Sequence, residues 1–165
     1  MNDIAASIGL ANLEFAECAV AACRANAEWY KKRLGGVDGV DAEQVSGFRF
    51  QVSRADGEEV SGFRGQISGE HGVDGITLPP PDPGSAWWLY TLLVPERDQF
   101  IAYMEDAGIE SSPVHARNDH HTAFYFPNGP LPGVDYFASY EVAIPVGWWL
   151  SAEERERVAE AVGRF

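Results

Sequence analysis

The feature that most constrains the fold is a short, almost unbroken apolar run, AWWLYTLLV, at residues 86–94. A stretch rich in proline and glycine precedes it and Pro95 follows it, so the run has the length and the borders of a strand. An apolar run without polar alternation is typical of a strand that is buried on both faces. We therefore expect a central strand here, covered on both sides by the other elements.

Residues 3–34 have a helical pattern, with Ile4, Ile8 and Leu13 forming an apolar stripe. The stripe changes phase near Leu13, which predicts a bend or a break between a short helix and a longer one. Basic residues occupy the last turn, where cations suit the helix dipole, and two glycines follow.

Two further helices are indicated nearer the C-terminus. Pro95 begins the first, which extends through Ala107 with an apolar inner face, and a glycine ends it. Ser151 followed by Glu154 is the pattern of a capping box, which predicts a last helix through Val162.

The remaining segments have strand and loop patterns. VSGFRFQVS at residues 45–53 recurs as VSGFRGQIS at 60–68, and the Asp-Gly pair between the copies predicts a β-hairpin. Residues 71–85 are expected to form a loop, as are residues 117–138. Strands are expected at 109–116, where Pro113 indicates an edge or a strand end, and at 139–146.

The order of these elements predicts an α+β fold, with a mainly antiparallel sheet and helices packed on one face. We expect residues 1–165 to form a single domain, because this length suits one hydrophobic core. Within it we distinguish a helical connector (1–35), a hairpin and loop (36–85) and a core of sheet and helices (86–165). Trp148 is expected to pack in the core, and at least one of Trp87 and Trp88 is expected to face the covered side of the sheet.

Charge and composition exclude some partners and compartments. The chain has 25 acidic and 12 basic residues, a formal net charge of −13, which repels phosphate backbones and argues against nucleic acid as a partner. We expect Cys18 and Cys23 to be reduced, small core residues. No secretion leader is recognisable, and no stretch is expected to supply the ~20 apolar residues that cross a bilayer. These features predict a soluble, cytoplasmic protein without a membrane partner.

The segment HARNDHH at residues 115–121 gathers three of the four histidines. A metal site is not expected, because adjacent histidines point apart in regular structure and no paired metal-ligand spacing occurs. Two interpretations remain open for this segment. Pro113 ends the preceding strand, so His115 and Arg117 are expected to project from a strand end, where binding sites tend to be built. The alternative is that Arg117 and Asp119 only order a polar loop, in which Asn118 caps a turn.

Several stretches, in this order, resemble the C-terminal part of the DegT/StrS-type sugar aminotransferases. MNDIAASIGLANLE resembles the helix that opens this part of the family's sequences, and WWLYTLLVPERDQFIAYMEDAGIESSPVHARNDHHTAF resembles its strand, helix and histidine-bearing segment. LPGVDYF and IPVGWWLSAEERERV resemble its closing stretch. Residues 36–85 fit only loosely.

The resemblance implies a fold-type-I aminotransferase that depends on pyridoxal phosphate and converts a nucleotide-linked keto-sugar into an amino-sugar. This chemistry needs a lysine that forms a Schiff base and an acid that keeps the pyridine nitrogen protonated. In the family both belong to an N-terminal cofactor-binding domain, which this sequence does not include. The only lysines, Lys31 and Lys32, stand at a helix end outside the family's lysine motif. The resemblance therefore implies no catalytic residue here, and no cofactor bound by this chain alone.

What the resemblance implies is a C-terminal small domain, catalytically incomplete alone, that supplies substrate-side loops and an interface. His115, Arg117 and Asn118 are its expected contacts with a nucleotide-sugar. The expected partners are a second copy of the chain or a separate large domain that binds pyridoxal phosphate. The alternative is a non-enzymatic binding or assembly module, and a third hypothesis is a metal-dependent hydrolase that uses His115, Asp119 and His120.

Overall fold

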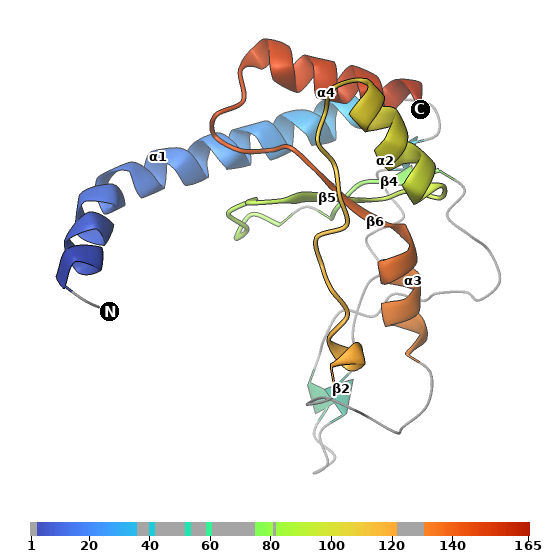
Figure 1. Ribbon diagram of the computed structural model, residues 1–165, viewed down its shortest axis with the longest axis horizontal. Helices are drawn as coiled ribbons and strands as arrows, with labels where there is room; N and C mark the ends of the chain where they lie inside the picture. Colours follow the sequence, from blue (N-terminus) through green and yellow to red (C-terminus); the bar gives the residue numbers. More distant parts are fainter. Residues whose placement is uncertain are drawn as a thin grey trace.

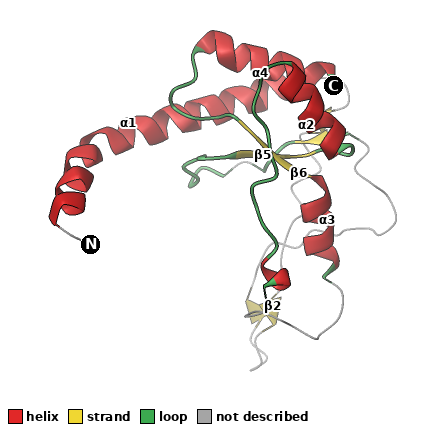
Figure 2. Ribbon diagram, viewed as in Figure 1, coloured by secondary structure: helices red, strands yellow, loops and turns green. Residues whose placement is uncertain are grey.

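The computed structural model describes residues 3–35, 40–41, 52–53, 59–60, 75–80, 82–121 and 131–165. The elements in chain order are α1 Asp3–Leu34, β1 Val40–Asp41, β2 Val52–Ser53, β3 Glu59–Val60, β4 Ile76–Thr77, β5 Tyr90–Leu93, α2 Arg97–Asp106, the 3₁₀ turn η2 Asn118–His120, α3 Pro132–Tyr140, β6 Glu141–Ile144 and α4 Ala152–Arg164. Helices account for most of the residues in regular structure (Figure 2).

The main sheet has the strand order β1-β4-β5-β6. The pairings of β4 with β5 and of β5 with β6 are antiparallel, as expected, whereas β1 pairs with β4 in parallel. The expected central strand is confirmed as β5, which lies between β4 and β6. It begins at Tyr90, later than the apolar run, and it alternates fully buried and half-buried side chains. One face of β5 is therefore more deeply covered than the other.

A single core lies between the sheet and the helices α1, α2 and α4, which Figure 1 shows on the same side of the strands. The register brings Tyr90 opposite Ile144 and Leu92 opposite Val142. All four side chains point to this core, because alternate residues of a strand share a face. The helices contribute apolar side chains to the same core: Ala27, Tyr30 and Leu34 of α1, Phe100 and Met104 of α2, and Val158, Ala159, Ala161 and Val162 of α4.

Helix α1 is one continuous helix, so the predicted break is absent, although Figure 1 shows it curving towards its N-terminal end. The last third packs in the core, whereas the first half projects from the body with its large apolar side chains exposed. By length and composition alone α1 satisfies the requirements for a membrane span, with a mean hydropathy of 1.4 over 18 residues, which corrects the expectation that no stretch is apolar enough. Helices of soluble proteins and signal sequences satisfy them too.

A buried polar contact fixes α1 to the other end of the chain. The Asn26 amide donates to the carbonyl oxygens of Val146 (3.2 Å) and Gly147 (2.9 Å), and its side-chain oxygen accepts from Arg155 of α4 (2.9 Å). The Arg155 guanidinium also lies 4.4 Å from the centre of the Trp29 ring. Because a buried amide is costly to leave unpaired, this network fixes how α1 and α4 pack.

The two predicted C-terminal helices are confirmed. Phe100 and Met104 bury the inner face of α2, and the chain leaves it through Gly108, whose φ of 70° suits glycine. The capping box is complete, because the Glu154 N–H donates to Ser151 Oγ (3.2 Å) and the Ser151 N–H donates to Glu154 Oε2 (2.8 Å). These contacts satisfy two of the donors that every helix start leaves open.

Three predictions for the loops and strands need correction. The expected strand at 109–116 is reduced to a single bridge between Ser112 and Ala143, and the expected loop at 117–138 contains η2 and most of α3. The expected loop at 71–85 contains β4. The antiparallel pairing of the predicted hairpin is present between β2 and β3, and the rest of its two repeats lies outside the described residues.

Candidate functional site

The histidine-bearing segment leaves the sheet at Pro113. Ser112 and Ala143 exchange both backbone hydrogen bonds, at 3.3 and 2.9 Å, and Pro113 follows directly after this bridge. The chain then runs extended to Arg117 and closes the turn η2, where the His121 N–H donates to the Asn118 carbonyl (3.1 Å). The site residues are thus placed beyond a sheet edge, where side chains are free to face a ligand.

Glu141, the first residue of β6, holds the start of this segment. Its Oε1 accepts the backbone N–H of His115 at 3.2 Å, and only 1% of the residue is exposed. Within the described residues, no hydrogen-bond partner is present for Oε2. A buried carboxylate oxygen without a donor is costly, so Glu141 combines a positioning contact with an unsatisfied acceptor close to the candidate site.

Arg117 forms the centre of an ion-pair network. Its Nε and Nη2 donate to the two carboxylate oxygens of Asp119 at 3.0 and 2.6 Å, and its Nη1 donates to Asp135 of α3. The hydrogen bonds from Arg117 hold the pKa of Asp119 below its ordinary value, and both carboxylates raise that of Arg117. The network fastens η2 to α3, in agreement with the interpretation that Arg117 and Asp119 order the loop.

A cavity of about 410 Å³ lies between this segment and α3. The three predicted residues, His115, Arg117 and Asn118, all line it, so the structure brings them together. The opposite wall is apolar and comes from Leu131 and from Val134, Phe137 and Ala138 of α3. The centres of the His115 and Phe137 rings are 6.0 Å apart. The arrangement is a small open hollow with polar side chains on one wall and apolar ones on the other.

The sequence reasoning missed Asp135, Phe137 and Glu141. A signal was present, because Pro132 is suited to the first helical turn and Asp135 falls in that turn. Val134, Phe137 and Ala138 also have the i, i+3, i+4 spacing of one helix face. The expected loop obscured this pattern, since the stretch is rich in proline and glycine.

The described residues include no group of three or more His, Cys, Asp or Glu side chains arranged to hold a metal ion. His120 and His121 are exposed and do not line the cavity. The hydrolase hypothesis required His115, Asp119 and His120 to share a metal, and the structure does not gather them.

The exposure of the tryptophan side chains agrees only in part with the prediction. Trp148 and Trp149 are 61% and 65% exposed and contact each other edge to face, so the expected packing of Trp148 in the core is wrong. They lie in the turn between β6 and α4, where the sheet offers no further cover. Trp87 packs partly against the core and Trp88 is exposed, which confirms that one of this pair faces the covered side.

Of the cysteines, Cys23 is buried as expected but Cys18 is exposed.

The lysines do not form a site for pyridoxal phosphate. Lys32 is 75% exposed and pairs with Glu28, 3.5 Å away. Lys31 lies beside a different cavity, whose carboxylates and arginine are already engaged with other groups of the chain. The described residues therefore do not fit this cofactor, and no chemical step is assigned through it.

Comparison with known proteins identifies similar chains. A scan against protein-family models gave no match. The curated "Erythromycin biosynthesis sensory transduction protein EryC1" of Saccharopolyspora erythraea is 32% identical over 93 residues, which cover 52% of this chain and 25% of that protein. The solved sugar aminotransferase CalS13 from Micromonospora echinospora is 33% identical with a TM-score of 0.66, and AtS13 from Actinomadura melliaura is 30% identical with a TM-score of 0.65.

These structural matches extend over nearly all of the present chain, 99% for CalS13 and 100% for AtS13. The same matches cover only 35% of each of those longer chains. The chain thus spans about a third of the length of the solved structures it resembles.

Proposed function

We propose, from the now confirmed resemblance to the C-terminal part of the DegT/StrS-type sugar aminotransferases, that this chain supplies the substrate-side loops and an interface of a nucleotide-sugar aminotransferase. The reaction is the transfer of an amino group onto a keto-sugar, with pyridoxal phosphate as the cofactor. The chain is catalytically incomplete alone, and a large cofactor-binding domain supplies the reacting groups.

The observation that carries this proposal is the match to CalS13, which is 33% identical and extends over 99% of the present chain. The match therefore extends over nearly the whole chain rather than over one motif.

The role of the cavity beside His115 follows from its charges. Arg117 faces Asp119 and Asp135, so one cation and two carboxylates give this group a formal charge of −1. An anionic pyrophosphate gains little from an arginine that two carboxylates already neutralise. Sugar hydroxyls, which both donate and accept hydrogen bonds, fit the carboxylates, the Asn118 amide and the His115 ring better. We assign the cavity to the sugar of the substrate, with Phe137 against its apolar face.

Titration of the isotope-labelled chain with UDP-glucose and dTDP-glucose, followed by amide NMR, tests this role. Signals of residues 115–119 are expected to shift with either nucleotide-sugar, and less with UDP alone, because the sugar makes the contacts. Arg117→Ala should remove the shifts, whereas the control Arg164→Ala, which breaks an exposed pair with Glu160, should retain them. Unperturbed signals at 115–119 in the folded chain would contradict the assignment.

The proposed dependence on a large domain has its own test. Purified chain mixed with pyridoxal phosphate is expected to show no aldimine absorbance and no transamination of a keto-sugar. Activity of the chain with no second polypeptide present would overturn the proposal.

One observation favours the alternative of a non-enzymatic binding or assembly module. Five large apolar side chains of α1 are 58–72% exposed, namely Ile4, Ile8, Leu10, Leu13 and Phe15. A surface of this kind marks an interface, and in the alternative it is the working part of the molecule. The alternative predicts self-association without nucleotide-sugar binding, so the titration above separates the two functions.

In either case we propose a soluble, cytoplasmic protein.

A further inference from the structure

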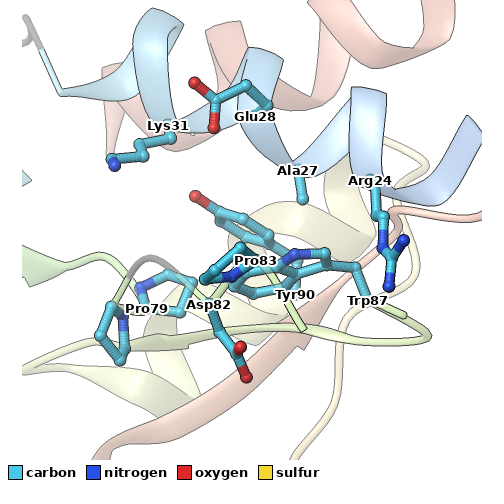
Figure 3. Close-up of a pocket in the computed structure, with 10 residues that line it drawn as sticks. Arg24, Ala27, Glu28, Lys31, Pro79, Asp82, Pro83, Trp87 and Tyr90 are labelled. Carbon is cyan, nitrogen blue, oxygen red and sulfur yellow. The ribbon is translucent and has the colours of Figure 1, made fainter. Parts of the chain in front are cut away.

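A second cavity, of about 430 Å³, lies between α1 and the segment that leads into β5 (Figure 3). Arg24, Glu28 and Lys31 line it from α1, and Asp82, Trp87 and Tyr90 line it from the other side. It shares no lining residue with the cavity beside His115. Its volume falls in the range of small-molecule sites, ~300–1,000 Å³.

Three of the four charged side chains in this cavity already have partners. Arg24 donates to the carbonyl oxygens of Ser85 (2.8 Å) and Gly84 (3.3 Å). Asp82 accepts the N–H of Gly84 at 2.9 Å, and Glu28 pairs with Lys32. The contacts of Arg24 and Asp82 are therefore made within the chain, whereas the Glu28 carboxylate also lies on the side of the cavity to which the Tyr90 hydroxyl points.

Lys31 is the exception. Across the described residues, no hydrogen bond or ion pair is recorded for its ammonium group, which Figure 3 shows at one end of the cavity. A half-buried ammonium without a partner leaves three donors and a positive charge available to a ligand.

The Tyr90 hydroxyl presents a second free donor at the same end. Tyr90 is 1% exposed, and its hydroxyl has no hydrogen-bond partner among the described residues. Figure 3 shows the hydroxyl pointing towards the α1 side chains Glu28 and Lys31. Burial, with smaller contributions from the charge of Glu28 and from Tyr30, raises the pKa of this phenol. The hydroxyl therefore stays protonated at neutral pH and is able to donate.

The rest of the wall is flat and apolar. The ring centres of Trp87 and Tyr90 are 5.5 Å apart, and Pro79 and Pro83 line the same space. Trp87 has a φ of 52°, a backbone conformation that is rare for a bulky residue, and this holds its indole at the cavity. Aromatic and proline faces of this kind favour a planar ring.

We propose that this cavity binds an aromatic carboxylate. The carboxylate accepts from the Lys31 ammonium and from the Tyr90 hydroxyl, and the ring lies against Trp87 and Pro83. The cavity favours an anion because Lys31 is its one charged side chain without a partner among the described residues. It favours a flat molecule because aromatic and proline rings form its walls.

Titration with 2-naphthoate tests the site, with 2-naphthalenemethanol as the uncharged molecule of the same ring system. The expected readout is a shift of the indole N–H signal that Trp87→Phe removes from the NMR spectrum. Naphthoate should bind at least five-fold more tightly than the alcohol, as expected for a partly exposed ion pair with a hydrogen bond.

Two variants assign the donors. Lys31→Met should weaken naphthoate about five-fold and leave the alcohol unchanged, whereas Arg164→Met, which removes one positive charge from an exposed pair outside the cavity, should affect neither. Tyr90→Phe should weaken naphthoate by a similar factor without unfolding the chain. Equal binding of the two ligands, equal effects of Lys31→Met and Arg164→Met, or no shift of the Trp87 indole would each refute the proposal.

Discussion

The carboxylate of Glu141 and the backbone N–H of His115 are joined by a hydrogen bond of 3.2 Å, from one end of β6 to the first residue of the candidate site. The bond connects the sheet to a segment whose described residues make a single bridge with that sheet. It explains how a loop without a strand of its own holds three polar side chains around one cavity.

Glu141→Ala should therefore destabilise the chain by about 1–3 kcal/mol, because it leaves the His115 N–H unpaired and opens a void. Glu141→Gln keeps an oxygen that accepts the His115 N–H, so it should retain most of the stability that Glu141→Ala loses. Urea unfolding measures both variants, and amide exchange at His115 reports the bond directly. If alanine and glutamine behave alike, the bond does not hold the segment.

The pair of Arg117 and Asp119 should make stability depend on pH in the acid range. The folded pKa of Asp119 is lowered by Arg117, so the stabilisation is present above the ordinary carboxyl pKa of ~4 and is lost as pH falls through the folded value. The stability difference between the unmodified chain and Asp119→Asn should thus be largest above about pH 5 and shrink towards pH 2. A difference that is constant over this range would contradict the pairing in solution.

Tyr90→Phe should raise the free energy of unfolding by up to about 1 kcal/mol, because it removes a buried hydroxyl that has no partner. Burial raises the pKa of Tyr90 in the folded chain. The stability that the protonated phenol contributes is therefore complete below the ordinary phenol pKa of ~10, and it is lost as pH rises through the pKa of the folded state. The variant should therefore retain more stability in alkali. Leu92→Ala, a loss of about 2–5 kcal/mol at a fully buried site, provides the scale for comparison.

Gly147→Ala should destabilise the chain by about 1–3 kcal/mol, because the added methyl group overlaps the indole ring of Trp149. Trp149→Ala should cost little alone, since that ring is largely exposed. The double variant should regain most of the stability lost in Gly147→Ala, a coupling that a double-mutant cycle measures. Strict additivity would show that the ring does not lie over Gly147.

Leu13→Glu and Phe15→Glu should each lower self-association of the chain, because they place a charge in the exposed apolar surface of α1. Asn12→Glu is the matched control, since it adds the same charge nearby without removing an apolar group. Sedimentation velocity over a range of concentrations compares the three. If the control dissociates the chain as much as the other two, net charge rather than the apolar surface governs association.

Most elements with strong local signals could be predicted from the sequence. The run at 86–94 contains the central strand, and Ser151 with Glu154 forms the predicted capping box, because in both cases neighbouring residues decide the outcome. The sequence does not predict helix α3, because Pro132 and Gly133 at its start are typical of loops. Tertiary contacts, such as the ion pair between Asp135 and Arg117, favour the helix instead.

Within the candidate site, the residue types were predicted and their surroundings were not. His115, Arg117 and Asn118 line one cavity, but their partners Asp135 and Glu141 are 18 to 26 residues away in the chain. No local pattern reports such pairings. The same holds for Trp148, whose exposure depends on where the sheet ends.

Helix α1 has 32 residues, which at ~1.5 Å per residue makes a rod about 48 Å long, and Asn26 anchors it to Gly147 and Arg155 near one end. The exposed N-terminal half of the helix projects from that anchor. A partner that binds this half is therefore connected to the sheet through the contacts of Asn26 with Gly147 and Arg155.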